Sequence, residues 1–159
     1  LGKALISSKI KTAISKSIWK GRLEKLSINN LFYDVAHNSE GVKAMLNTIN
    51  TLYPNKDKIG LFCIKSDKNI SAICKLLKNN FKKLILCNDG NGYLIKASDL
   101  KIIMNKNNIE SISVKSVEEG ISFLKEYSDP KYVNLIFGSH YIANEVYTTI
   151  GKYFDTTYN

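Results

Sequence analysis

Three polar side chains lie close together in a short stretch of the chain. Asp34, His37 and Asn38 follow the apolar run 31–33, which predicts a buried strand. A helix is expected to begin directly afterwards, at Ser39. In open α/β sheets, ligands bind beyond the carboxyl ends of the strands. The stretch therefore predicts a ligand site at the carboxyl end of this strand.

Arg22 is the only arginine among the 23 lysine and arginine residues of the chain. Its guanidinium can bind a phosphate or a carboxylate through two parallel hydrogen bonds, which a lysine cannot do. Asp34, at the end of the predicted strand, can hold ribose hydroxyls or support a metal ion. Each residue also has a plain structural alternative, since Arg22 can pair with Glu24 on the surface and Asp34 can cap a turn.

The segment 137–141, FGSHY, repeats the order of strand, small residue and polar residues. Ser139 is expected at the start of a helix, where free N–H groups bind carboxylate or phosphate, although an ordinary N-cap serine fits the same position. A Ser139–His37–Asp34 hydrolase triad lacks the GxSxG elbow. His37 and His140 lack the spacing of a metal site. We therefore expect neither a hydrolase triad nor a metal site among these residues.

The composition predicts one soluble cytoplasmic domain. The chain has 159 residues, 44% of them hydrophobic, which is enough for a core. Its net charge of +9 comes from lysines spread evenly along the sequence. A compositional bias explains that charge, so we expect no nucleic-acid partner. No apolar run approaches the roughly 18–20 residues of a membrane span, and the N-terminal residues lack a signal-peptide core. The three cysteines lack metal-binding spacing and are expected to be buried thiols.

Apolar runs and amphipathic stretches alternate along the chain in a βαβ pattern. The expected strands are Leu23–Leu26, Leu31–Tyr33, Ile59–Ile64, Lys83–Cys87, Ile109–Val114 and Tyr132–Phe137, and the expected helices are Ser39–Leu52, Ile70–Phe81, Ser98–Met104, Ser116–Tyr127 and Tyr141–Tyr153. This alternation predicts an α/β fold, with a Rossmann-like, mostly parallel, doubly wound sheet of about six strands and helices on both faces. Residues 1–18 are predicted to form a linker helix or the end of a preceding domain, and residues 19–159 one further domain.

Several motifs together resemble those of one enzyme family. Residues 19–24 (WKGRLE) are similar to the family's W-P-G-R-x-E, residues 34–38 (DVAHN) to its D-G-A-H-N, residues 66–69 (SDKN) to its D-K-D turn, and residues 137–143 (FGSHYIA) to its final G-S-x-Y segment. Their order and spacing match as well. From residue 19 to about residue 147, the chain thereby resembles the C-terminal domain of the folylpolyglutamate synthase/dihydrofolate synthase family, within the Mur ligase superfamily.

The resemblance implies an ATP-dependent ligase. Family members activate a dihydropteroate or folate carboxylate as an acyl phosphate, which the amine of L-glutamate then attacks. By motif match, Arg22 would contact the ATP phosphates and steady the transferred phosphoryl group, and Asp34 would contact the nucleotide. His37 and Asn38 would lie where glutamate meets the acyl phosphate. Ser139 would help to hold the carboxylate of the incoming glutamate.

The resemblance also implies a missing half of the site. The P-loop and the Mg²⁺ ligands of the family belong to an N-terminal ATPase domain, and no GxxxxGK[ST] occurs in this sequence. Because the chain begins at Leu1, we expect a fragment that is monomeric and inactive without that domain. Lys20, Val35 and His140 stand where the family has proline, glycine and an apolar residue, and none of them removes a proposed ligand.

Two other functions remain open at this point. One is the corresponding domain of a Mur-type peptidoglycan ligase, although the GRLE and DxAHN motifs favour the folate enzymes. The other is a non-catalytic Rossmann-like module that binds an anion or a partner.

Overall fold

The computed structural model describes residues 20–26 and 30–152. The linker helix expected over residues 1–18 lies outside the described residues. So do residue 19 and the tail from residue 153 onward, which belong to the domain expected over residues 19–159.

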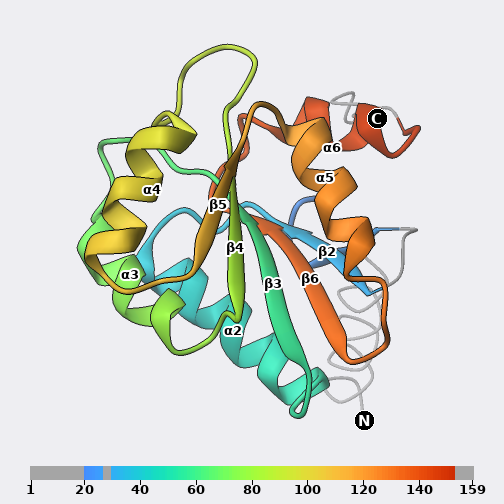
Figure 1. Cartoon of the computed structure of the whole chain (residues 1–159). Helices are drawn as coiled ribbons and strands as arrows, with labels where there is room; N and C mark the ends of the chain where they lie inside the picture. Colours follow the sequence, from blue (N-terminus) through green and yellow to red (C-terminus); the bar gives the residue numbers. More distant parts are fainter. Residues whose placement is uncertain (1–19, 27–29, 153–159) are drawn as a thin grey trace, which may run out of the picture.

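The described part of the chain contains one mostly parallel sheet (Figure 1). Its strands are β1 (Glu24–Lys25), β2 (Leu31–Asp34), β3 (Asp57–Phe62), β4 (Lys83–Cys87), β5 (Ser111–Val114) and β6 (Tyr132–Phe137). They lie in the order β1-β2-β6-β3-β4-β5. The short edge strand β1 is antiparallel to β2, and the other neighbouring strands are parallel. The predicted six-stranded, mostly parallel sheet is therefore confirmed.

Helices cover both faces of this sheet, as the sequence pattern predicts for a doubly wound fold. The helices are α2 (Ser39–Leu52), α3 (Ile70–Lys78), α4 (Ala97–Lys106), α5 (Val117–Glu126) and α6 (Ala143–Thr149). Figure 1 shows α2, α3 and α4 against one face and α5 and α6 against the other. The strands β3, β4 and β6 lie between these two layers and are apolar over most of their length because both of their faces are buried.

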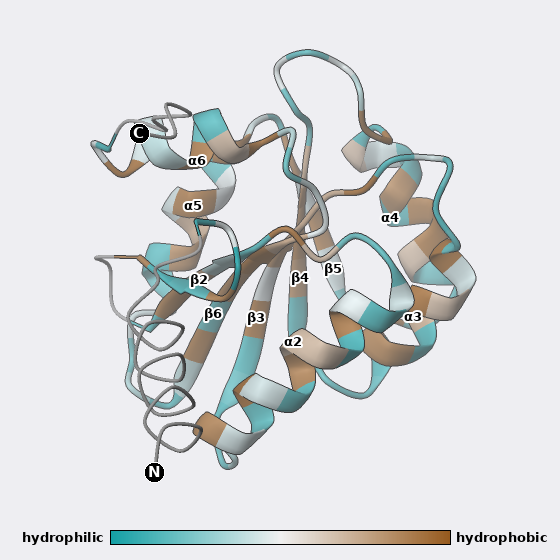
Figure 2. Cartoon of the chain, turned by 180° about the vertical axis from the view of Figure 1, so that it is seen from behind, coloured by the Kyte–Doolittle hydropathy of each residue, from teal (hydrophilic) through white to brown (hydrophobic). Residues whose placement is uncertain are grey.

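The hydrophobic core has two halves, one on each side of the sheet. Side chains of α2, α3 and α4 pack with Phe62, Leu84 and Phe137 in one half. Side chains of α5 and α6 pack with Leu61, Ile85 and other residues that point to the opposite face of the same strands. Figure 2 shows the hydrophobic colour along the strands and on the parts of the helices that turn toward them. Because successive side chains of a strand point to opposite faces of the sheet, the strands β3, β4 and β6 each contribute residues to both halves of the core.

The ends of the helices follow local signals in some cases and long-range contacts in others. Helix α5 follows Ser116, whose Oγ accepts the N–H of Glu119 at 3.2 Å, as a capping serine should. The helix expected from Ser98 instead begins at Ala97, whose N–H donates to Oδ1 of Asn88 at 2.8 Å. The prediction of Ser98 as the cap is therefore wrong, because the acceptor comes from a loop nine residues upstream.

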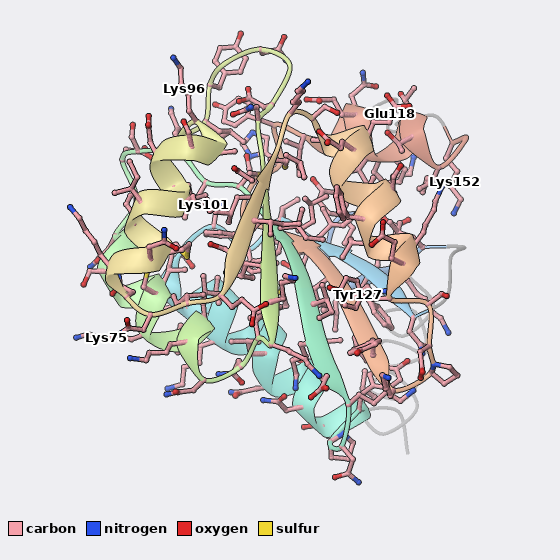
Figure 3. All side chains as sticks on the ribbon, viewed as in Figure 1. Lys75, Lys96, Lys101, Glu118, Tyr127 and Lys152 are labelled. Atoms are coloured by element: carbon pink, nitrogen blue, oxygen red, sulfur yellow. The ribbon has the colours of Figure 1, made fainter. Side chains whose placement is uncertain are left out.

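Most lysines of the described region are exposed or half-exposed, and Lys58 is the buried exception among them. Figure 3 shows Lys75, Lys96 and Lys152 projecting outward from separate parts of the molecule. This arrangement agrees with the even spread of basic residues along the sequence. No helix in residues 20–26 and 30–152 is long and apolar enough to cross a membrane.

Candidate functional site

The strands β2, β6 and β3 end at the same level, side by side within the sheet. Asp34 is in register with Phe137, and Phe137 is in register with Phe62. The segments 35–38, 138–142 and 63–69 therefore leave the sheet next to one another. This edge is where an open parallel sheet binds its ligand.

A small polar pocket of about 100 Å³ lies between these segments. It is lined by His37, Lys65, Asp67, Lys68, Gly138, Ser139, His140 and Tyr141. The structure thus brings together His37 and Ser139, which are 102 positions apart in sequence numbering (139 less 37). It does not place Arg22, Asp34 or Asn38 in the lining of this pocket.

Lys65 and Lys68 are pocket residues that the sequence-based site does not include. Lys68 forms an ion pair with Asp67 at 3.2 Å, and the Lys65 ammonium lies 5.9 Å from the ring centroid of Tyr141. The two lysines outnumber the single carboxylate, which favours an anionic ligand. The D-K-D-like turn at residues 66–69 is a sequence signal for Lys68. The local sequence does not show that β3 and β6 are neighbours in the sheet, and this neighbourhood makes Lys68 a pocket residue.

Gly138 allows the main chain to pass tightly against the end of β3. Its φ is +109°, and a Cβ at this position would lie 1.9 Å from the carbonyl oxygen of Cys63. No L-residue with a side chain fits there without movement of the backbone. The glycine therefore fixes the path by which the chain enters the pocket lining at Ser139.

Ser139 is buried in the wall of the pocket, with 2% of its surface exposed. Its Oγ accepts the N–H of Tyr141 at 3.0 Å, and its carbonyl oxygen accepts the hydroxyl of Tyr33 at 3.0 Å. Helix α6 begins only at Ala143, so the prediction that Ser139 lies at a helix start is wrong. The serine instead stabilises a tight turn, and its hydroxyl hydrogen remains available to a ligand.

His37 has a defined tautomer. Its Nδ1 lies 3.0 Å from the carbonyl oxygen of Val35. Because a carbonyl oxygen only accepts, Nδ1 must carry the proton in this contact, and Nε2 of the neutral ring is then a proton acceptor. The ring is half-buried in the lining of the pocket.

Asn38 caps α2. Its Oδ1 accepts the N–H of Gly41 at 2.8 Å, and its side chain is exposed. This contact uses the oxygen of the amide and leaves its NH₂ group as a donor.

Asp34 holds the loop that carries Arg22. The carboxylate is 8% exposed, and its Oδ1 and Oδ2 accept the N–H groups of Ala36 at 2.7 Å and Leu23 at 2.8 Å. Burial raises the pKa of this carboxyl group, although the two N–H groups and the charge of Arg22 each lower it. Asp34 therefore fixes the Arg22 loop against the end of β2, and each oxygen retains a second lone pair.

Arg22 is exposed at the tip of this loop. The surface pair with Glu24 that the sequence allows does not form; Oε2 of Glu24 instead accepts the N–H of Gly21 at 3.1 Å and the hydroxyl of Tyr147. Among the described residues, no ion pair involves Arg22. Its guanidinium is thus presented to solvent on a loop that several hydrogen bonds hold in place.

The site does not have the geometry of a hydrolase triad. The contacts given above for Ser139, His37 and Asp34 all lead to main-chain atoms. Within the two described ranges, no group of three or more histidine, cysteine, aspartate or glutamate side chains is placed to hold a metal ion.

Comparison with known proteins places these features in a family. The family described as "Mur ligase, glutamate ligase domain" matches residues 21–140. This range includes the Arg22 loop and most of the pocket. A search of curated proteins gave no match.

Several solved structures share the fold. Folylpolyglutamate synthase of Mycobacterium tuberculosis, complexed with ADP and AMPPCP, is 21% identical over 87% of this chain and 34% of that chain, with a TM-score of 0.76. E. coli FolC in complex with DHPP and ADP is 20% identical over 84% of this chain and 32% of that chain, with a TM-score of 0.72. The bifunctional folylpolyglutamate synthase/dihydrofolate synthase with Mn, AMPPNP and L-glutamate bound is 19% identical over 86% of this chain and 32% of that chain, with a TM-score of 0.72. The chain therefore spans about one third of the length of these proteins.

Proposed function

Because the chain belongs to the Mur ligase family as its glutamate ligase domain, we propose that it forms one half of the active site of an ATP-dependent ligase. The reaction would join L-glutamate to the carboxylate of dihydropteroate or of a folate. The observation that carries this proposal is the polar pocket at the ends of β2, β6 and β3, which combines His37, Ser139 and two lysines. Its donors and its excess of lysines over carboxylates suit an amino acid with two carboxylates.

In this proposal, Arg22 binds the phosphates of ATP. A bidentate, permanently charged guanidinium stabilises the charge that develops during phosphoryl transfer, and the exposed position of Arg22 leaves it accessible to a nucleotide held by a second domain. Asp34 uses its remaining lone pairs to accept ribose hydroxyls while it holds the loop through Leu23. Phosphoryl transfer needs positioned positive charge rather than a covalent nucleophile; Arg22 supplies that charge, and Asp34 positions the loop that carries it.

His37 and Ser139 act on the incoming amino acid. The amine of glutamate must lose a proton before it can attack, and Nε2 of His37 is an acceptor because Nδ1 is hydrogen-bonded to the carbonyl of Val35. Ser139 donates its hydroxyl hydrogen to a glutamate carboxylate. The free NH₂ group of Asn38 donates to an oxygen of the acyl group.

ATP and Mg²⁺ are expected partners of the complete enzyme. ATP supplies the phosphoryl group that activates the acceptor carboxylate. Arg22 and Asp34 fit the phosphates and the ribose, whereas the described residues offer no cluster of metal ligands. We propose that an N-terminal ATPase domain of the same protein holds the Mg²⁺. A half-site alone cannot offset the entropy lost when it immobilises a ligand, so the isolated chain is predicted to be inactive.

The test uses the full-length gene product with ATP, Mg²⁺, L-glutamate and either dihydropteroate or tetrahydrofolate. The expected result is phosphate release together with a product that is heavier by one glutamyl residue. Arg22→Ala should lower kcat by about 100-fold, and Ser139→Ala should raise KM for glutamate by roughly tenfold. The matched controls are Lys75→Ala and Ser98→Ala, two exposed residues on α3 and α4 that should leave both constants unchanged.

Other outcomes would reject the folate assignment. Turnover only with a peptidoglycan precursor as the acceptor would identify a Mur-type ligase. A folded protein that neither binds ATP nor turns over with any of these acceptors would contradict the ligase function and leave a binding module.

A further inference from the structure

The loop that carries Arg22 is held by hydrogen bonds to residues at the end of β2. The carbonyl oxygen of Gly21 accepts the N–H of Val35 at 2.8 Å, and Asp34 accepts the N–H of Leu23 at 2.8 Å. Leu23 has a φ of +44°, in the left-handed region that a leucine rarely adopts. The surroundings therefore hold this loop in a conformation that is not intrinsically favoured.

A further contact joins the loop to a distant helix. Oε2 of Glu24 accepts the N–H of Gly21 at 3.1 Å and also the hydroxyl of Tyr147, which is in α6. Tyr147 is 1% exposed. Burial and the bond to Glu24 raise the pKa of its hydroxyl, so the tyrosine remains a neutral donor. The bond between Tyr147 and Glu24 thus joins residues that are 123 positions apart.

The same helix follows the chain segment that lines the pocket. The hydroxyl of Tyr33 donates to the carbonyl oxygen of Ser139 at 3.0 Å, and the ring of Tyr33 packs edge-to-face against Tyr147 with 6.1 Å between centroids. The two buried tyrosines therefore form a continuous path from Glu24 to Ser139. The path connects the loop proposed to bind the phosphates with the wall proposed to bind the amino acid.

We propose that Glu24 and Tyr147 are positioning residues that set the Arg22 loop relative to the Ser139 pocket. This inference rests on the proposed ligase function. Two substrates that react with each other need both half-sites at a fixed separation, and a displacement of about 1 Å can lower a rate about 100-fold. The Glu24–Tyr147 contact fixes that separation directly, because it joins the loop to the helix that follows the pocket segment.

The decisive variant is Tyr147→Phe in the full-length enzyme, because it deletes one oxygen and keeps the ring that packs against Tyr33. We expect kcat to fall about tenfold, while KM for glutamate changes less than twofold. Glu24→Ala should lower kcat by the same factor. Glu24→Gln should keep most of the wild-type kcat, because it keeps an acceptor oxygen. The Glu24→Ala/Tyr147→Phe double variant should have a kcat no lower than that of either single variant. The control is Tyr132→Phe, because Tyr132, on β6, also packs edge-to-face against another tyrosine, Tyr127.

A second readout does not depend on ligase activity. In this chain, Tyr147→Phe should lower the hydrogen-exchange protection of the Leu23 amide at least tenfold, and Tyr132→Phe should not. A Tyr147→Phe variant with a lower melting temperature but unchanged kcat and unchanged protection of the Leu23 amide would overturn the positioning role. The contact would then be structural only. An inactive wild type would refute the proposed function instead, and the exchange measurement alone would then decide whether Tyr147 holds the loop.

Discussion

Gly138→Ala is predicted to be one of the most damaging single-methyl changes in the chain. The added Cβ would lie 1.9 Å from the carbonyl oxygen of Cys63, so the two segments must move apart by more than 1 Å to reach even the closest tolerated contact of 3.0 Å. Overpacking of this kind costs about 1–3 kcal/mol or more. The φ of +109° adds about 1–3 kcal/mol for an alanine. We therefore expect a loss of about 4 kcal/mol in the free energy of unfolding.

The measurement is urea denaturation of the wild type and two variants, followed by circular dichroism. A loss of about 4 kcal/mol is a large part of the stability of a domain and corresponds to a melting temperature lower by about 8–16 °C. Gly92→Ala is the matched control, because Gly92 has a φ of +72° but no atom within 4 Å of the added Cβ. It should cost only about 1 kcal/mol from backbone strain. Equal losses in the two variants would refute the close approach at Gly138.

Three further predictions concern stability. Asp34→Ala removes the acceptor of two backbone N–H groups and should lower the free energy of unfolding, measured by urea denaturation, by about 2–4 kcal/mol. Asp57→Ala breaks only an exposed ion pair and should lower it by less than about 1 kcal/mol. Equal losses would contradict the role of Asp34 in holding the Arg22 loop. Burial raises the pKa of Tyr33 and Tyr147 in the folded state. The two neutral hydroxyls therefore contribute their full stability below the ordinary tyrosine pKa of about 10, and the free energy of unfolding should fall as the pH rises above that value. Absorbance at 295 nm should then show fewer than the nine tyrosines of the chain ionising while it is folded, and nine ionising without unfolding would rule the prediction out. Ser116→Ala should cost about 1 kcal/mol through loss of the α5 cap and Ser116→Gly only a few tenths, a difference that thermal denaturation can detect.

Much of the fold follows from local sequence patterns. The helix Ser39–Leu52 and the strands Lys83–Cys87 and Tyr132–Phe137 have the predicted bounds, because apolar periodicity, caps and breakers all act within a few residues. The helix predicted over residues 141–153 is only Ala143–Thr149 within the described chain. Its predicted start failed because the N–H of Tyr141 bonds to the Ser139 hydroxyl in a turn before the helix.

The site could be predicted only in part. Motif resemblance predicts His37 and Ser139 as site residues, and the structure places both in the lining of one pocket. The parts that the sequence did not reveal depend on strand order, since β6 lies between β2 and β3 although it is the last strand in the chain. That order makes Lys65 a pocket residue. It also allows Tyr147 to reach Glu24, a contact that no local pattern encodes.

The most direct test of the proposed function is a crystal structure of the full-length protein with AMPPNP and L-glutamate. We predict a glutamate carboxylate about 2.7–3.0 Å from Oγ of Ser139 and the amino nitrogen next to Nε2 of His37, with the guanidinium of Arg22 on the nucleotide phosphates. Glutamate bound away from the His37–Ser139 pocket, or a nucleotide that does not contact Arg22, would contradict the assignment of this domain as half of a glutamate ligase site.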